Sequence, residues 1–302
     1  MRILFVTSTR IGDAVLSTGL LDHLLRTHPA ARITVACGPV AEGVFARMPG
    51  RERTIVVEKQ PLSLHWPLLW SRVAFTRWDL VVDLRGSALG WMVPAARRAV
   101  MRGGRRPGHR LGHIASVLGL EPPPLPVAWW DEADAGRAAA LLPGGPWLLV
   151  GPTANWAGKV WPAERFVDLA RAVTTGPLAG ARVAVLGGPG HAERAMATPV
   201  LDALPGSVDL VGALTLPEAA ACLSRAALFV GNDSGLMHLS AAAGTPTLGL
   251  FGPTPASEYG PAGRRARAVL ADGSPGSAPM EALPVRRVLD AAEALLRSPV
   301  VA

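Results

Sequence analysis

The stretch at residues 228–254, LFVGNDSGLMHLSAAAGTPTLGLFGPT, decides the fold class of this chain of 302 residues. It opens with a short apolar run at 228–230, passes through a polar turn and closes with a second apolar run at 247–251. Between the runs, a segment of helical length begins near Ser234, and its small residues let a helix pack closely on a sheet. The order strand, helix, strand is typical of a right-handed βαβ unit in a parallel sheet.

The same alternation continues outward from this stretch. In the second half of the chain, apolar runs predict strands at residues 147–150, 182–186 and 208–211, with helices beginning near 162, 191 and 216. In the first half, they predict strands at residues 2–7, 33–36, 54–57 and 80–83, with a first helix over 14–28. We therefore expect an α/β fold of two Rossmann-like domains whose parallel sheets face a central cleft.

A connector rich in proline and glycine marks the expected domain boundary. The segment PGGP at residues 143–146 divides the two runs of alternation, so we expect domains at 1–144 and 145–302. Each domain then has the size that a single hydrophobic core sustains. The last helix is expected over 284–297, and it is a candidate for packing back on the N-terminal domain.

The composition of the chain indicates which binding partners and which cellular location to expect. The net charge of +7 and the pI of about 10.7 favour anionic partners, but no recognisable nucleic-acid-binding motif accompanies the arginines. Cys37 and Cys222 have no zinc or redox spacing and are expected to be reduced thiols. The chain enters a strand pattern at once and offers no apolar window of about 18 residues. We expect a cytoplasmic protein without a membrane span.

The turn TRIGDAVLST at residues 9–18 joins the first expected strand to its helix, where an open parallel sheet binds its ligand. Gly12 permits close approach of the backbone, but the turn lacks the GxGxxG fingerprint of dinucleotide-binding enzymes. Asp13 has two interpretations. Its position favours an N-cap that satisfies free amides of the first helical turn. Its place at the ligand edge also allows a carboxylate base.

The loop GPTANWAGKVWP at residues 151–162 carries Lys159, one of only two lysines in a chain whose other cationic side chains are arginines. A compact ammonium beside Thr153 and Asn155 suits a diphosphate, although an ordinary exposed loop has the same composition. The spacing fails the P-loop pattern, because six residues rather than four separate its glycines and Val160 follows the lysine. We therefore discount a P-loop kinase or ATPase.

Two further turns carry polar residues at the starts of helices. In GGPGHAE, residues 187–193, Glu193 either binds a ribose hydroxyl or occupies the first turn of its helix. In the opening stretch, a helix begins whose free amides suit a phosphate, although its first residues are also ordinary capping residues. The candidate residues at that helix are Asp233, Ser234, Gly235 and His238, the last of which follows Ser234 by one turn on the same face.

Together these segments resemble the heptosyltransferase family of lipopolysaccharide core assembly, glycosyltransferase family 9. Three segments carry the resemblance: IGDAVLST after the first strand, the loop that ends in KVWP, and NDSGLMHLSAAAGTPTLGLFGPT. The alternation between them agrees, so the resemblance spans nearly the whole chain. It implies a GT-B fold, with an N-terminal acceptor domain and a C-terminal nucleotide-sugar donor domain.

The resemblance also implies an inverting transfer without an essential metal ion or cofactor. A sugar, here the heptose of ADP-heptose, would pass to a lipopolysaccharide-core or related glycan acceptor. Asp13 then corresponds to the base and Lys159 to the diphosphate-binding lysine. Asn155 departs from the Ser or Thr that the family commonly carries, which makes Thr153 the alternative hydroxyl contact. The expected donor-binding residues are Gly12, Thr153, Asn155, Glu193, Asp233, Ser234, Gly235 and His238.

Two segments are candidates on the acceptor side. The arginine-rich segment 97–110 suits an acidic glycolipid or an anionic lipid face, or else it is solvated loop charge. We take Arg85, Arg105 and Arg106 as the expected acceptor contacts. The tryptophan-rich segment 62–78 is either an amphipathic helix that touches the inner membrane or a core helix, and the core helix is favoured.

Other classes of function make different demands. A GT-B-shaped sugar-nucleotide epimerase or hydrolase would need no acceptor. A non-catalytic nucleotide-sugar-binding protein would not need both Asp13 and Lys159. A Rossmann dehydrogenase is disfavoured by the missing glycine fingerprint. The acidic segment DEAD at residues 131–134 has the wrong spacing for a metal-binding DxD motif.

Overall fold

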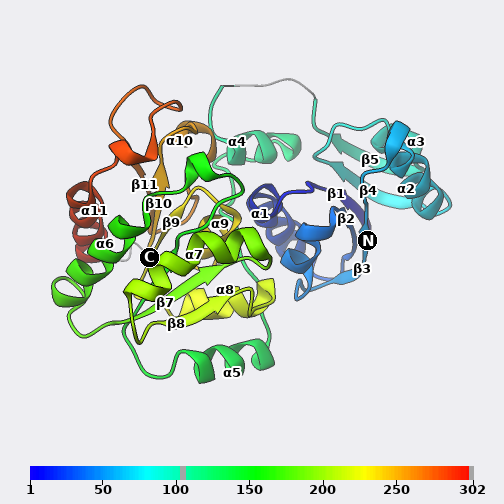
Figure 1. Ribbon diagram of the computed structural model, residues 1–302. Helices are drawn as coiled ribbons and strands as arrows, with labels where there is room; N and C mark the ends of the chain where they lie inside the picture. The colour runs from blue at the N-terminus through cyan, green and yellow to red at the C-terminus, as the bar shows by residue number, and fades with distance from the viewer. Residues whose placement is uncertain (103–106, 299–302) are drawn as a thin grey trace. The chain divides into compact units, whose positions relative to one another are not determined.

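The computed structural model describes residues 1–102 and 107–298 of the chain. The chain divides into two compact units, Met1–Trp129 and Trp130–Ala302. Each unit has its own parallel sheet and its own helices (Figure 1). The α/β class expected from the alternation of strands and helices is confirmed. Within the described residues, no helix combines the length and the apolar composition that crossing a bilayer requires.

The first unit is built on five strands, Arg2–Val6 (β1), Arg32–Cys37 (β2), Arg51–Val56 (β3), Trp78–Asp83 (β4) and Ala95–Val100 (β5). They form one sheet in the order β3-β2-β1-β4-β5, with every neighbouring pair parallel. In this register Phe5 lies between Val35 of β2 and Val82 of β4. The three central strands are almost continuously apolar, as expected for a parallel sheet buried on both faces.

Four helices accompany this sheet: Ile11–Thr27 (α1), His65–Val73 (α2), Leu89–Met92 (α3) and Arg110–Ala115 (α4). Short 3-10 turns occupy Pro39–Phe45 (η1), Pro61–Ser63 (η2) and Ser116–Leu118 (η3). On one face of the sheet, Leu4 packs in a cluster with Leu69 of α2 and Leu89 of α3. Because side chains alternate along a strand, the neighbouring Phe5 points to the opposite face, where it is fully buried.

The second unit is built on six strands, Trp147–Gly151 (β6), Arg182–Gly187 (β7), Val208–Val211 (β8), Leu228–Asn232 (β9), Thr247–Phe251 (β10) and Ala266–Leu270 (β11). Their order is β11-β10-β9-β6-β7-β8, and all neighbours are parallel. Residues 228–254, which decided the fold class, therefore form β9, the following helix and the adjacent strand β10. The expected βαβ unit is confirmed.

The helices of this unit are Glu132–Leu141 (α5), Ala163–Thr175 (α6), His191–Ala203 (α7), Leu216–Ser224 (α8), Gly235–Ala242 (α9), Ala256–Tyr259 (α10) and Val285–Arg297 (α11). Two 3-10 turns lie at Ala157–Lys159 (η4) and Met280–Ala282 (η5). Phe166 of α6, Ala197 of α7 and Val288 of α11 share one core with the apolar strands. The last helix thus belongs to the core of its own unit.

In each sheet the strand order reverses direction at one point, between β1 and β4 in the first and between β6 and β9 in the second. Ligands of open parallel sheets bind outside the carboxyl ends of the strands at such points. The loop after β1 leads into the first turn of α1, which carries Asp13, and the loop after β6 contains Lys159. Both segments that carry the predicted residues therefore lie where ligands of open parallel sheets bind.

The units divide earlier than the sequence indicated, after Trp129 rather than near residue 144. The reason is α5, which packs on α8 of the second unit. Arg137 of α5 forms an ion pair with Glu218 of α8 at 2.8 Å, and the Arg225 guanidinium donates to the Leu142 carbonyl. The PGGP segment therefore joins two elements of one unit.

Several local expectations were also wrong. Helix α1 begins at Ile11, three residues earlier than its apolar spacing indicated. The arginine-rich segment 97–110 is not one loop, because Arg97 and Arg98 lie on the edge strand β5 and Arg110 begins α4. The segment 62–78 is not one helix, since it comprises η2, α2 and the first residue of β4, where Trp78 is buried.

Candidate functional site

The loop after β6 and the turn after β9 hold an ion pair at the strand-order reversal of the second sheet. Lys159 Nζ lies 2.6 Å from Asp233 Oδ2, and the two side chains are only 16% and 8% exposed. Thr254, which follows β10, donates its hydroxyl to the same carboxylate oxygen at 2.8 Å. Lys159 and Asp233, which the sequence predicted from two separate turns, are thus brought together with Thr254 by the ends of three adjacent strands.

The residue before Asp233 fixes the end of the lysine loop. Asn232 is fully buried, and its Oδ1 accepts a hydrogen bond from the Trp161 backbone amide at 3.0 Å. The indole of Trp161 is fully buried as well and donates to the Leu283 carbonyl at 2.8 Å. The backbone is therefore pinned two residues after Lys159, which holds the ammonium at the end of β9.

Replacing Asn232 by alanine is expected to lower the free energy of unfolding by about 1–3 kcal/mol, because the buried Trp161 amide loses its acceptor. Urea denaturation followed by tryptophan fluorescence measures the change. The matched control is Asn155→Ala, which removes an exposed amide from the same loop and should shift stability by less than about 0.5 kcal/mol. Equal effects of the two substitutions would show that the Asn232 contact does not hold the loop.

Helix α9 opens beside this ion pair. Ser234 is its N-cap residue in extended conformation, but the Ser234 side chain does not cap the helix. The Ser234 Oγ is buried and has no hydrogen-bond partner among the residues that the structure describes. The first amides of a helix have no acceptor within the helix and form its positive end. A hydroxyl and free amides next to an ammonium suit a phosphate group. His238, one turn further, is 4% exposed.

The other predicted donor residues differ in how accessible they are. Thr153 is 2% exposed, whereas Asn155 on the same loop is exposed to solvent. Glu193 lies in the first turn of α7 and accepts a hydrogen bond from the Gly188 amide at 3.0 Å. Glu193 therefore closes its own glycine-rich turn, which is the structural alternative weighed for it. Its contact with a ribose stays a prediction.

Asp13 lies in the first turn of α1, beyond the carboxyl end of β1. The N-cap residue of α1 is Arg10, so Asp13 is the third helical residue and its interpretation as an N-cap is wrong. Its Oδ2 accepts from the Ser8 hydroxyl at 3.4 Å, and its Oδ1 lies 3.5 Å from Arg110 Nε. The side chain is 20% exposed, so the carboxylate is oriented from two sides and still open to a ligand. Gly12 precedes it in the same turn.

A cavity of about 250 Å³ opens over Asp13, at the carboxyl ends of β1, β4 and β5. Its lining residues are Thr7, Ser8, Asp13, Leu84, Arg85, Met101, Arg102, Arg110 and Ile114. Three arginines around one carboxylate favour an anionic ligand that presents a hydroxyl to the carboxylate. Arg85 is where an acceptor contact was expected, while Arg105 and Arg106 lie outside the described residues. Arg102 and Arg110 were predicted only as members of the arginine-rich segment 97–110 and not as individual acceptor contacts.

A buried carboxylate holds the loop that carries Arg85. Asp83 ends β4, is fully buried and accepts hydrogen bonds from the Arg85 amide at 2.8 Å and from the Ser87 hydroxyl at 2.5 Å. Burial raises the pKa of Asp83 above its ordinary value, although these hydrogen bonds act in the opposite direction. The Arg85 backbone is thus fixed relative to the strand that neighbours β1.

The acidic residues at 131–134 have a structural role. Asp131 and Asp134 form a reciprocal capping box at the start of α5, with hydrogen bonds of 3.0 and 3.1 Å. Within residues 1–102 and 107–298, no three His, Cys, Asp or Glu side chains are grouped closely enough to hold a metal ion. The cationic side chains at the two candidate sites are Lys159 in the second unit and Arg85, Arg102 and Arg110 in the first.

The chain is similar to one known protein family and to its members. Residues 109–281, more than half of the chain, match the model of glycosyltransferase family 9 (heptosyltransferase). Lipopolysaccharide heptosyltransferase 1 of Pseudomonas aeruginosa is 26% identical over 303 residues, which cover 87% of this chain and 82% of that protein.

Two solved structures share the fold. A glycosyl transferase family 9 protein of Veillonella parvula superposes with a TM-score of 0.81 at 23% identity, covering 98% of this chain and 97% of its own. The E. coli heptosyltransferase WaaC, solved with ADP, has a TM-score of 0.75 at 20% identity, covering 98% of this chain and all of its own. The expected GT-B fold is confirmed. On the family match and these likenesses, the chain belongs to glycosyltransferase family 9, the heptosyltransferases, and is a glycosyltransferase.

Proposed function

We propose that this glycosyltransferase moves a heptose from ADP-heptose to a lipopolysaccharide-core acceptor, with inversion at the anomeric carbon and without a metal ion. The relative from P. aeruginosa is named a lipopolysaccharide heptosyltransferase, and the WaaC structure contains ADP. The observation that carries the proposal is the cluster of Lys159, the Ser234 hydroxyl and the first amides of α9 at one strand-order reversal. Such a cluster suits the diphosphate of a nucleotide sugar.

The donor diphosphate becomes more negative as its bond to the sugar breaks. In our proposal Lys159 and the amino end of α9 lie against that diphosphate and stabilise the charge that develops on the departing oxygen. These groups supply the positive charge that a bound metal ion supplies in other transferases, which supports the metal-independent form of the proposal. Asn155 and Glu193 complete the proposed donor site around the nucleotide.

Asp13 is the proposed base. The acceptor hydroxyl transfers its proton to the Asp13 carboxylate while its oxygen bonds to the anomeric carbon. The bond between that carbon and the diphosphate oxygen breaks, and the electron pair leaves with the nucleoside diphosphate. A single displacement of this kind inverts the anomeric centre. The arginines around Asp13 suit the negative charge of a lipopolysaccharide-core acceptor.

Thermal unfolding in the presence of nucleotides tests the donor assignment. ADP or ADP-heptose at one hundred times its dissociation constant should stabilise the folded chain by about 2.7 kcal/mol. We expect UDP and GDP to give smaller shifts, and adenosine, which lacks the diphosphate, to give little. The absence of a shift with every nucleoside diphosphate would contradict the donor site.

Sugar transfer must also be separated from a reaction that needs no acceptor. A sugar-nucleotide epimerase or hydrolase would convert ADP-heptose in the absence of any glycan. We expect negligible release of ADP under those conditions and rapid release once a lipopolysaccharide-core acceptor is added. The proposed location is the cytoplasmic face of the inner membrane, where an activated sugar and a lipid-linked acceptor meet.

A further inference from the structure

The exposed large apolar side chains are concentrated on one part of the first unit. Of the eleven such side chains in the described residues, seven lie between residues 62 and 92. We call this set the apolar face; it consists of Leu62, Leu64, Leu68, Trp70, Phe75, Trp91 and Met92. Leu62, Phe75 and Trp91 are 93%, 92% and 66% exposed. Apolar surface gathered to this degree marks an interaction site rather than ordinary scatter.

The apolar face spans η2, α2 and α3, and α2 and α3 lie side by side in Figure 1. Trp70 of α2 donates its indole N–H to the Met92 carbonyl of α3 at 3.1 Å, and its ring centroid lies 6.5 Å from that of Phe75. At the other end, Leu62 and Ser63 adopt the left-handed conformation with φ of 52° and 59°. That conformation is unfavourable for residues with a Cβ, so the turn holds Leu62 in solvent at a local cost.

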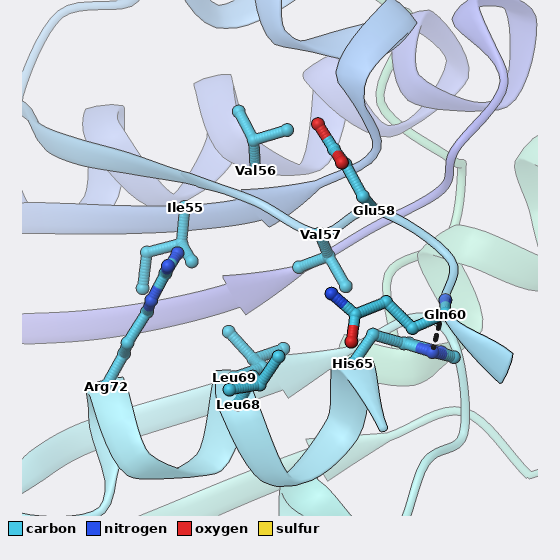
Figure 2. A pocket seen from close by; sticks show the side chains of 9 residues that line it. All are labelled: Ile55, Val56, Val57, Glu58, Gln60, His65, Leu68, Leu69 and Arg72. Carbon is cyan, nitrogen blue, oxygen red and sulfur yellow. Dashed lines mark hydrogen bonds between the residues drawn. The ribbon is translucent and has the colours of Figure 1, made fainter. Parts of the chain in front are cut away.

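Hollows flank α2 on both sides. Toward α3, a hollow of about 570 Å³ is lined by Trp66, Pro67, Trp70, Leu89, Met92 and Arg85, and it is largely apolar. Toward β3, a pocket of about 390 Å³ contains Leu68 and Leu69, and Figure 2 shows Arg72 at one end of it and His65 with Gln60 at the other. Of the α2 side chains, only Leu69 and Val73 are buried. The helix therefore presents most of its apolar surface outward.

The charge around the apolar face is mainly positive. Between residues 58 and 102 the sequence contains seven Lys or Arg residues and three acidic residues, of which Asp83 is buried and Glu58 and Asp79 are exposed. Arg72 and Arg77 flank Phe75 and are exposed, as are Arg97 and Arg98 on β5. Basic residues around exposed tryptophan, phenylalanine and leucine match the interface of an anionic bilayer, which takes apolar side chains below its negative head groups.

We propose that the apolar face is the surface on which this protein docks to an anionic lipid bilayer. Leu62, Phe75 and Trp91 enter the boundary between head groups and acyl chains, and the surrounding arginines bind the head groups. Amphipathic indole rings such as that of Trp91 suit this boundary.

The place of Arg85 connects this surface with the proposed reaction, and this step rests on the proposed function. Arg85 lines both the apolar hollow and the Asp13 cavity, and its guanidinium lies 5.7 Å from the centre of the Trp66 ring. A lipid-linked acceptor that presents its glycan at the membrane surface can place its acyl chains beside the apolar hollow and its anionic sugars in the arginine-lined cavity. Docking then delivers the acceptor hydroxyl toward Asp13.

Vesicle co-sedimentation of the full chain tests the docking surface. The variant Leu62→Ser/Phe75→Ser/Trp91→Ser changes only exposed side chains, so it should fold and keep its thermal shift with ADP. We expect the unmodified protein to bind vesicles of phosphatidylethanolamine with phosphatidylglycerol more strongly than pure phosphatidylcholine vesicles. The affinity of the triple variant for the anionic vesicles should be lower than that of the unmodified protein by about tenfold or more. The control is Leu270→Ser, an exposed leucine on β11 of the second unit, which should bind as the unmodified protein does.

Two results would overturn the docking surface. Unchanged vesicle binding by the triple variant would mean that the apolar face does not contact lipid. A concentration-dependent dimer that the triple variant abolishes, without vesicle binding by either protein, would mean that a second copy of the chain covers the face. Failure of the proposed function looks different, because vesicle binding would then persist while nucleotide shifts and sugar transfer are missing.

Discussion

Asp13→Asn should lower the turnover number for sugar transfer by about 10²–10⁴-fold while leaving nucleotide binding nearly unchanged. The amide keeps the size of the side chain but cannot take the proton of the acceptor hydroxyl. Asp13 and Arg110 are partly exposed, so loss of their 3.5 Å ion pair should change stability by less than about 1 kcal/mol. Initial rates of ADP release with saturating donor and acceptor measure the effect.

The control for this experiment lies on the same helix. Asp22→Asn removes a carboxylate of α1 that pairs with Arg26 on the outer side of the helix, and we expect its turnover to match that of the unmodified enzyme. The thermal shift with ADP should be the same in both variants. Full turnover by Asp13→Asn would exclude Asp13 as the base and would leave the arginine-lined cavity as a binding site only.

Lys159→Met is the second substitution with a large expected effect. Methionine fills similar space without the charge, so the departing diphosphate loses its ammonium, and turnover should fall by about 10²–10³-fold. The Michaelis constant for the donor should rise as well, because the same ammonium binds the ground-state diphosphate. Rates over a series of donor concentrations separate the two effects.

The effect of Lys159→Met on the stability of the fold must be separated from its effect on turnover. Lys159→Met leaves the Asp233 carboxylate, which is 8% exposed, without its cation, and such a loss destabilises a protein. The double variant Lys159→Met/Asp233→Asn removes both charges and should recover stability but not turnover. Lys59→Met removes the only other lysine of the chain, which is exposed, and should change neither stability nor turnover. Recovery of turnover in the double variant would show that Lys159 only neutralises Asp233.

The sequence was informative where function depends on the ends of central strands. Lys159 and Asp233 follow strands β6 and β9, whose apolar runs are plain in the sequence, and parallel neighbours present their carboxyl ends at one edge. The placement of both residues at one edge of the sheet therefore follows from the βαβ pattern, whereas the adjacency of β6 and β9 comes from the strand order of the structure. The position of Asp13 beyond β1 follows in the same way, although the helix start was misplaced and with it the N-cap interpretation.

The features of the fold and of the site that could not be predicted depend on strands at sheet edges and on tertiary contacts. Strand β5 lies at the edge of its sheet and carries exposed Arg97 and Arg98, so it shows no apolar run. Arg110 contacts Asp13 although the two residues are 97 positions apart in the chain. The local spacing of residues in the sequence cannot predict such a contact. The segment 62–78 is apolar enough for a core helix, and only the packing of α2 shows which of its side chains stay outside.

The ion pair of Lys159 with Asp233 has a consequence for the end of the catalytic cycle. A diphosphate that engages the ammonium competes with a carboxylate 2.6 Å away, which is held in place by the Thr254 hydroxyl. When the nucleoside diphosphate leaves, Asp233 is positioned to take the ammonium back at once. In the proposed function the protein thus carries its own exchangeable counter-ion, which would weaken retention of the spent nucleotide and favour the next turnover.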